Sequence, residues 1–277
     1  MGVPYAEVIG DPIDHSKSPL IHKFWLEKTG VDGDYRACRV TSEGLAAYFA
    51  ARAGEPDWRG CNITMPHKYA ALEHVRFPRD PNYPVEPVNV AFRQERWDRI
   101  DGLNSDRIGF VEPLLPMHGG EVGRPRGAAV IVGAGGAAAA AAWMMPVLGY
   151  GPVWIVARDP GKAVRMASDF ASIGAIAAPF SDSLPEARLL VNASPLGMTG
   201  FPVFPFSLDC MAPDGIVYDL VYAPVETALL QAARRRDLQA IDGLTMLIGQ
   251  AAIAFQAFFR TPPSRAFDDE LRESLLR

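Results

Sequence analysis

The stretch Gly127-Ala-Ala-Val-Ile-Val-Gly-Ala-Gly-Gly-Ala-Ala-Ala-Ala-Ala-Ala-Trp143 decides the fold of this chain. Its apolar run, Ala129 to Val132, has the length and character of a buried strand in a parallel sheet. The glycines that follow predict a tight turn, and the alanines after them favour a helix. Strand, turn and helix in this order leave backbone N–H groups at the helix N-terminus, where a pyrophosphate would be stabilised.

A second strand begins roughly 20 residues after the glycines, the spacing of a βαβ dinucleotide-binding unit, and it ends at Arg158. An arginine there favours the 2′-phosphate of NADP, whereas an acidic residue favours the 2′-hydroxyl of NAD. The neighbouring Asp159 favours NAD, because its charge would repel a phosphate. The third glycine of G-x-G-x-x-G is Ala138, a tolerated variant. We expect NADP as the cofactor, with NAD as the alternative.

The composition, 49% hydrophobic and 21% charged over 277 residues, is typical of about two globular domains. A net charge of −5 argues against a nucleic-acid partner and offers no basic patch for a membrane. Three scattered cysteines indicate reduced thiols, not a disulfide frame or a zinc site. The sequence predicts neither a signal peptide nor a membrane span. We therefore expect a cytoplasmic protein with no metal.

The first part of the chain is predicted to form an open α/β domain. We predict strands over residues 5–9, 34–40, 60–63, 88–93 and 97–100, and helices over residues 18–30 and 44–53, with a loop over residues 77–87. Ser18 followed by Pro19 is a good N-cap and first helical residue. Ser16 would lie at the carboxyl end of the first strand, where open α/β sheets bind ligands.

The third predicted strand is followed by a candidate functional lysine. Pro66 is expected to open a helix, with Thr64 and Lys68 at its first turn. The helix dipole disfavours a cation at that end, so a lysine there is a better functional candidate than a surface lysine elsewhere. Further along, Ser105 or Asp106 is a candidate cap for the next helix.

The composition changes near residue 110, where prolines and glycines precede the glycine motif. Beyond it we predict strands over residues 128–132, 153–157, 188–191, 215–219 and 239–241, and helices over residues 136–148, 160–171, 225–235, 242–259 and 266–276. This alternation is typical of a doubly wound parallel sheet. The segments Asn192 to Met198 and Asp219 to Pro224 should lie at its ligand-binding edge.

Taken in order, the motifs resemble those of the shikimate dehydrogenase family over essentially the whole chain. They are His15-Ser16-Lys17-Ser18-Pro19, Asn62-Ile-Thr-Met-Pro-His-Lys68, Asn89, Gly102-Leu-Asn-Ser-Asp106, the glycine turn, Asn192 to Met198, Asp219-Leu-Val-Tyr-Ala-Pro224 and Gly243-Leu-Thr-Met-Leu-Ile-Gly-Gln250.

The resemblance implies an α/β fold with two domains, an open substrate-binding catalytic domain over residues 1–110 and a Rossmann-type NADP-binding domain over residues 111–242. It implies that C-terminal helices, residues 243–277, pack back on the substrate domain. The implied activity is that of an NADP-dependent oxidoreductase that reduces 3-dehydroshikimate reversibly to shikimate, in aromatic amino-acid biosynthesis. We expect a small-molecule substrate and a monomer or homodimer.

The resemblance also implies site residues. Lys68 and Asp106 would be the catalytic pair, a proton acceptor and the carboxylate that holds it. Substrate-binding residues would be Ser16, Ser18, Thr64, Asn89, Asp106, Tyr222 and Gln250. Cofactor-binding residues would be Gly133, Ala134, Gly135, Gly136, Ala137, Arg158, Ser194, Leu220 and Gly243.

Several positions depart from the family pattern. Val90 stands where the family has threonine, Ala157-Arg158-Asp159 replaces N-R-T, Ala138-Ala139 replaces A-R, and residues 74–87 do not follow the pattern. These departures leave open a quinate/shikimate dehydrogenase that uses NAD or both cofactors. A nucleotide-binding sensor without turnover is a third alternative, disfavoured because it would not need both Lys68 and Asp106.

Overall fold

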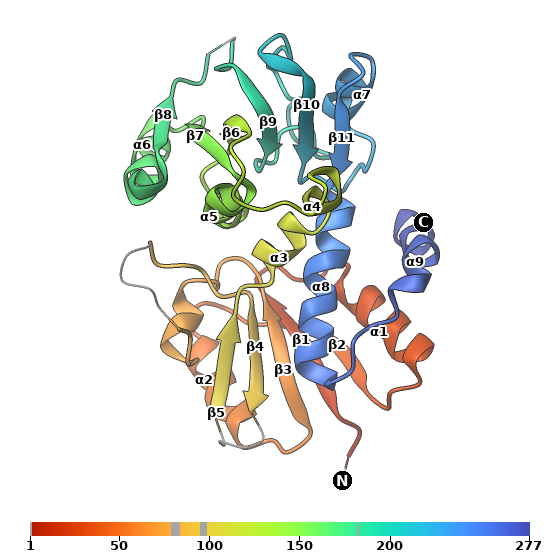
Figure 1. Ribbon diagram of the computed structural model, residues 1–277. Coiled ribbons are helices and arrows are strands. Elements are labelled where there is room, and N and C mark those ends of the chain that lie inside the picture. The colour runs from red at the N-terminus through yellow and green to blue at the C-terminus, as the bar shows by residue number, and fades with distance from the viewer. Residues whose placement is uncertain (1, 79–83, 95–98, 182) are drawn as a thin grey trace. The chain divides into compact units, whose positions relative to one another are not determined.

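The computed structural model describes residues 2–78, 84–94, 99–181 and 183–277 (Figure 1). These residues form two compact units. The first contains residues 2–78, 85–94, 99–108 and 248–277, and the second contains residues 84, 109–181 and 183–247. The turn of the predicted hairpin, and residues 79–83 of the predicted loop, lie outside the described residues. None of the helices in the described ranges has the length and apolar character needed to cross a membrane.

The first unit contains a five-stranded sheet in the order β2-β1-β3-β4-β5. Strand β1 runs parallel to β2 and β3, and β4 runs antiparallel to β3 and β5. Its elements are β1 (Tyr5–Gly10), α1 (Ser18–Thr29), β2 (Asp34–Arg39), α2 (Leu45–Ala53), β3 (Trp58–Ile63), the 3₁₀ helix η1 (Ala70–Glu73), β4 (Val90–Gln94), β5 (Arg99–Leu103), η3 (Arg265–Phe267) and α9 (Asp268–Leu276). The helices α3 (Asp106–Val111) and α8 (Gly243–Phe259) each contain residues of both units. The described part of the last strand, Arg99–Leu103, extends beyond the predicted end at residue 100, because Leu103 pairs with Val90 of β4.

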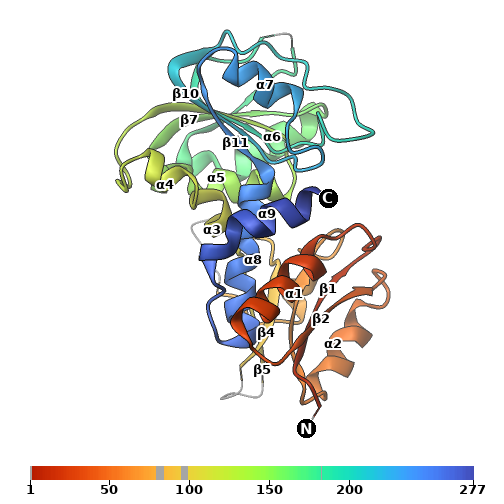
Figure 2. The same ribbon diagram turned by 90° about the vertical axis from the view of Figure 1, so that its right-hand side faces the viewer.

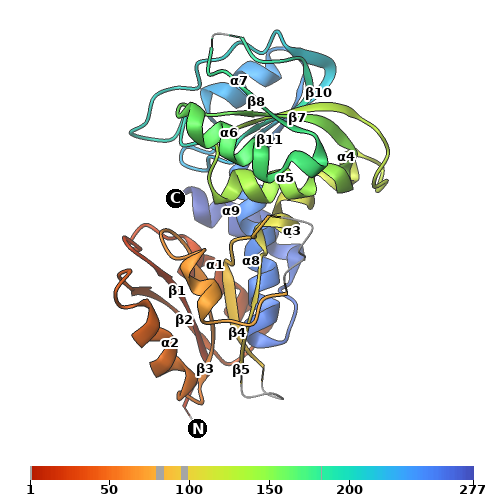
Figure 3. The same cartoon turned by 90° about the vertical axis from the view of Figure 1, so that its left-hand side faces the viewer.

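Helices cover both faces of this sheet (Figure 3). On one face α2 buries Leu45, Tyr48 and Phe49 in an apolar cluster with residues of β1 and β3. On the other face, α1 packs with Tyr35 and the second half of α8. The aromatic side chains that meet there are His22, Trp25, Tyr35, Phe255 and Phe258.

The C-terminal helices thus complete the first unit, as expected. Lys28 of α1 also forms an ion pair with Glu270 of α9, at 2.8 Å, and the two helices lie together in Figure 2.

The second unit contains a six-stranded parallel sheet in the order β11-β10-β9-β6-β7-β8. Its elements are α4 (Leu114–Met117), β6 (Gly127–Val132), α5 (Gly136–Leu148), β7 (Tyr150–Val156), α6 (Pro160–Asp169), the 3₁₀ helix η2 (Ala171–Ile173), β8 (Ala175–Ala178), β9 (Ala187–Asn192), β10 (Met211–Asp219), α7 (Ala228–Arg234) and β11 (Gln239–Asp242). Starting from β6, the chain builds outward through β7 and β8, then returns to the other side of β6 with β9. This is the doubly wound Rossmann order, with its switch point between β6 and β9.

Alternate residues of β6 face opposite layers of the second unit. Ala129 and Ile131 belong to the cluster with α5 and α6, whereas Val130 and Val132 pack with α7. The predicted boundaries shift at α7, which begins at Ala228 because Thr227 Oγ1 accepts a hydrogen bond from the Leu230 N–H, at 3.2 Å. The sequence did not predict β8.

One side chain of β4 stabilises the end of α2. Arg93 Nη2 donates to the carbonyl oxygens of Arg52, Ala53 and Glu55, at 2.8, 2.9 and 2.9 Å. We expect Arg93→Met to lower the free energy of unfolding by about 1–2 kcal/mol, because terminal helix carbonyls lose a cationic donor. Denaturant unfolding measures the effect. Arg39→Met, a control that removes an exposed guanidinium in the same unit, should cost less than about 0.5 kcal/mol; equal losses would contradict the capping role.

Candidate functional site

Lys68 lies in a turn after β3 and not in a helix. The predicted helix at Pro66 is wrong: residues 65–69 form a turn, which leads into η1. The physical reason is that segments just after β2 and just before β4 use the polar groups of this turn. Val88 N–H donates to the Lys68 carbonyl oxygen at 2.9 Å, and the buried His67 Nε2 donates to the Val40 carbonyl oxygen at 2.6 Å. The dipole argument for Lys68 therefore does not apply, but the bond to Val88 brings Lys68 beside Asn89.

Lys68 and Asp106 form a close ion pair. Lys68 Nζ lies 2.6 Å from Asp106 Oδ2, and the two side chains are 22% and 11% exposed. Asp106 is the first residue of α3, and its N–H donates to Asn104 Oδ1 at 3.0 Å. The carboxylate is therefore not a helix cap. An ammonium held by a carboxylate and still reachable from solvent is a group that can exchange a proton with a bound ligand.

Two buried amides, Asn89 and Gln250, belong to the hydrogen-bond network of this pair. Asn89 Nδ2 donates to Asp106 Oδ1 at 2.8 Å and to Ser105 Oγ at 3.0 Å. Ser105 Oγ in turn donates to Gln250 Oε1 at 3.2 Å. Lys68, Asp106 and Asn89 are thus connected by direct bonds, and Ser105 joins Gln250 to them. For Ser105 the sequence indicated only a possible capping role.

Ser16, Ser18 and Thr64 follow the adjacent strands β1 and β3. Thr64 N–H donates to the Ile9 carbonyl oxygen at 2.9 Å, so these two strands end side by side. The predicted N-cap role of Ser18 is wrong: α1 begins at Ser18, and Lys17 occupies the cap position without a side-chain cap bond. Ser16 Oγ instead accepts from the Ser18 N–H at 3.3 Å.

The glycine turn follows β6 in the second unit. Gly133 has φ +128°, and a Cβ on it would lie 2.5 Å from the Ala193 carbonyl oxygen, so this position requires glycine. At Gly135 an added Cβ would meet no atom within 4 Å. Gly135 is also the N-cap of α5, and because glycine has no side chain it leaves the first N–H groups of the helix without a side-chain cap. Open space at an uncapped helix N-terminus fits a dinucleotide pyrophosphate held along Gly133, Ala134, Gly135, Gly136 and Ala137.

Arg158 and Asp159 follow β7, and both are exposed. Asp159 is the N-cap of α6: its Oδ1 accepts from the N–H groups of Gly161 at 2.9 Å and Lys162 at 3.3 Å. The Asp159 carboxylate therefore caps the N-terminus of α6, and this structural role explains an acidic residue at that position.

A buried carboxylate organises the loops after β9 and β10. Asp219 is fully buried and accepts hydrogen bonds from Asn192 Nδ2 at 2.8 Å, Val221 N–H at 3.1 Å and Thr227 Oγ1 at 2.6 Å. Burial raises the pKa of Asp219, and these bonds lower it in part. Ser194 Oγ donates to Asn192 Oδ1 at 2.7 Å, so the predicted cofactor residue Ser194 is held by the same group of side chains.

Two further predicted cofactor residues meet in the second unit. Gly243 begins α8 directly against Leu220, since a Cβ on Gly243 would lie 2.2 Å from the Leu220 carbonyl oxygen. Tyr222, predicted to bind substrate, also belongs to the second unit and is 38% exposed. None of the described contacts joins Tyr222 to Lys68 or Asp106, so its role stays a prediction.

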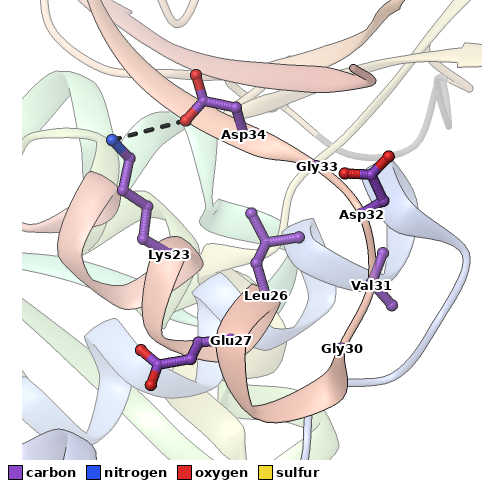
Figure 4. A pocket seen from close by; sticks show the side chains of 8 residues that line it. All are labelled: Lys23, Leu26, Glu27, Gly30, Val31, Asp32, Gly33 and Asp34. Carbon is purple, nitrogen blue, oxygen red and sulfur yellow. Dashed lines mark ion pairs between the residues drawn. The ribbon is translucent and has the colours of Figure 1, made fainter.

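An open hollow of about 520 Å³ lies at the end of α1, where Figure 4 shows Lys23 paired with Asp34 at 3.6 Å. Its lining residues are Lys23, Leu26, Glu27, Gly30, Val31, Asp32, Gly33 and Asp34. It contains none of the predicted site residues.

Comparisons with known proteins find similar proteins along the whole chain. Residues 8–90 match the family model for the shikimate dehydrogenase substrate binding domain. The chain is 47% identical to the shikimate dehydrogenase (NADP(+)) of Sphingopyxis alaskensis, over 99% of this chain and 97% of that protein.

Several solved structures resemble the whole chain. A shikimate 5-dehydrogenase from Thermus thermophilus, in complex with NADP(H) and shikimate, has 33% identity and a TM-score of 0.82, covering 98% of this chain and 99% of that one. A quinate dehydrogenase from Corynebacterium glutamicum, in complex with NAD, has 25% identity and a TM-score of 0.82, covering 99% of both chains.

Proposed function

This chain belongs to the shikimate dehydrogenase family, and from that premise we propose that it is an NADP-dependent shikimate dehydrogenase. It reduces 3-dehydroshikimate reversibly to shikimate, a step of the shikimate pathway towards chorismate and the aromatic amino acids. The observation that carries the proposal is the contact between Lys68 Nζ and Asp106 Oδ2, at 2.6 Å, among polar side chains at one edge of the first sheet.

The side chains of the first unit supply the proton chemistry and the substrate contacts. In the reduction, the Lys68 ammonium donates a proton to the carbonyl oxygen, and in the oxidation its amine accepts the hydroxyl proton. Asp106 holds Lys68 Nζ, and Asn89 holds Asp106. We assign Ser16 and Ser18 to the substrate carboxylate. We assign the ring and its hydroxyls to Thr64, Asn89, Asp106 and Gln250 of this unit. Tyr222 belongs to the second unit, and its substrate contact stays a prediction.

NADPH, when bound, supplies the hydride for the carbonyl carbon. Within the second unit, Gly133, Ala134, Gly135, Gly136 and Ala137 would hold its pyrophosphate at the N-terminus of α5. Arg158 would contact the 2′-phosphate. Ser194, Leu220 and Gly243, at the carboxyl ends of β9, β10 and β11, would lie along the rest of the cofactor. The cytoplasmic location and a monomer or homodimer stay predictions.

Initial rates of the purified protein with shikimate and with quinate, each with NADP and with NAD, test the proposal. We expect shikimate with NADP to exceed every other pair in kcat/KM by about tenfold or more, the effect of one charge-assisted contact. The second candidate, a quinate/shikimate dehydrogenase, is favoured by Val90, which stands where the family has threonine. Comparable rates with quinate or NAD would establish that candidate, and no turnover with any pair would overturn both.

A further inference from the structure

Ser105 joins two amides that are far apart in the sequence. Its hydroxyl accepts from Asn89 Nδ2 at 3.0 Å and donates to Gln250 Oε1 at 3.2 Å, and its backbone N–H donates to Asn89 Oδ1 at 2.7 Å. Ser105 is completely buried, Asn89 is 3% exposed and Gln250 is 8% exposed. In so buried a place each of these polar groups depends on protein partners.

These bonds determine how the Asn89 amide is turned. A backbone N–H can only donate, so the amide atom that faces Ser105 N–H must be the oxygen. The amide nitrogen then faces Ser105 Oγ and Asp106 Oδ1, at 3.0 and 2.8 Å. With Oδ1 of Asp106 engaged in this way, Oδ2 is the atom that contacts Lys68 Nζ. The orientation of the carboxylate therefore follows from that of Asn89, which Ser105 sets.

We propose that Ser105 is a positioning residue for the reaction. Its backbone N–H sets which way the Asn89 amide faces, and its hydroxyl holds that amide and Gln250 in place and, through Asn89, the carboxylate of Asp106. The inference rests on the proposed function, which gives Lys68 and Asp106 the proton transfer. Without the hydroxyl, Asn89 and Gln250 each lose one buried bonding partner and turn more freely. The carboxylate then spends less time in the orientation that holds Lys68, and turnover falls.

Ser105→Thr and Ser105→Val form a matched pair, because their side chains have the same shape and differ in a hydroxyl and a methyl group. With shikimate and NADP, we expect the valine variant to have a kcat/KM about 10- to 100-fold below that of the threonine variant. A large part of the loss should lie in kcat. The pH profile of kcat should also differ between the two, whereas their affinity for NADP should be equal.

A merely structural role predicts a different result. The valine variant would unfold at a lower temperature, but at temperatures where both variants are folded they would have equal kcat values and equal pH profiles. That result, or equal kcat/KM values in the two variants, overturns the inference. If the valine variant does not fold, Ser105→Ala removes the hydroxyl without adding bulk, and the same comparison is made with the wild type. A wild type that does not oxidise shikimate overturns the proposed function, whereas an active wild type with equal variants overturns this inference alone.

Discussion

Lys68→Ala is expected to lower kcat for shikimate oxidation by about 10²–10⁴-fold, the usual contribution of a general acid–base group, while the Kd for NADP stays unchanged. The substitution removes the ammonium that contacts Asp106 Oδ2 and leaves that carboxylate bonded to Asn89. The alcohol then loses the group that we propose to accept its proton. Stopped-flow or steady-state rates give kcat, and a fluorescence titration gives the affinity for NADP.

Lys23→Ala is the matched control for this experiment. Lys23 is a lysine of the same unit, 58% exposed and paired with Asp34 at 3.6 Å in the hollow of Figure 4. Exposed pairs of this kind contribute about 0–1 kcal/mol, so neither activity nor fold should change. A loss of turnover and of NADP binding to the same extent in Lys68→Ala would instead indicate a structural role for Lys68.

Arg158→Ala is expected to raise the KM for NADP about 10- to 100-fold and to change the KM for NAD less than about twofold, since only NADP has a 2′-phosphate for the guanidinium. Arg158 is exposed directly after β7, on an edge where parallel sheets bind ligands. Arg188→Ala, which removes an exposed arginine paired with Asp214 in the same unit, is the control and should leave both values unchanged. If both cofactors lose affinity equally, Arg158 does not recognise the phosphate.

The effect of the Asp159 charge on cofactor choice can be tested without disturbing the helix cap. Asparagine caps a helix about as well as aspartate, so Asp159→Asn keeps the bonds to Gly161 and Lys162 and removes the negative charge beside Arg158. This variant separates the effect of the Asp159 charge on NADP from its capping of α6. Measured with the same KM assays as Arg158→Ala, NADP should bind a few-fold more tightly, and the stability of the fold should not change.

Much of the fold could be predicted from local signals. The glycine stretch predicts β6 and α5 closely, because an apolar run and an alanine run leave few other conformations. β8 was missed because Ala175–Ala178 is four residues long and made largely of alanine, which has no strand preference. Similarly, β10 begins at Met211, four residues before the prediction, since its first part pairs with β9 across a register shift.

The candidate site could be predicted in its residue types but not in its connections. The motifs indicated Lys68 and Asp106, yet the expected helix at Pro66 was wrong, because the bond from Val88 to the Lys68 carbonyl oxygen is a contact between distant segments. The role of Ser105 was missed for the same reason: its partner Gln250 lies 145 residues away. Local capping rules cannot find such a bond.

The first unit draws its core from both ends of the chain, and this has a consequence during synthesis. The aromatic rings of His22 and Trp25 are covered in part by Phe255, with ring centroids 5.9 and 5.7 Å apart. The ribosome makes Phe255 only after all of residues 109–247, which make up nearly all of the second unit. Domains fold as units once their residues have emerged. The nascent chain should therefore complete its second unit first, and its N-terminal segment should stay open to chaperones and proteases until the last helices are made.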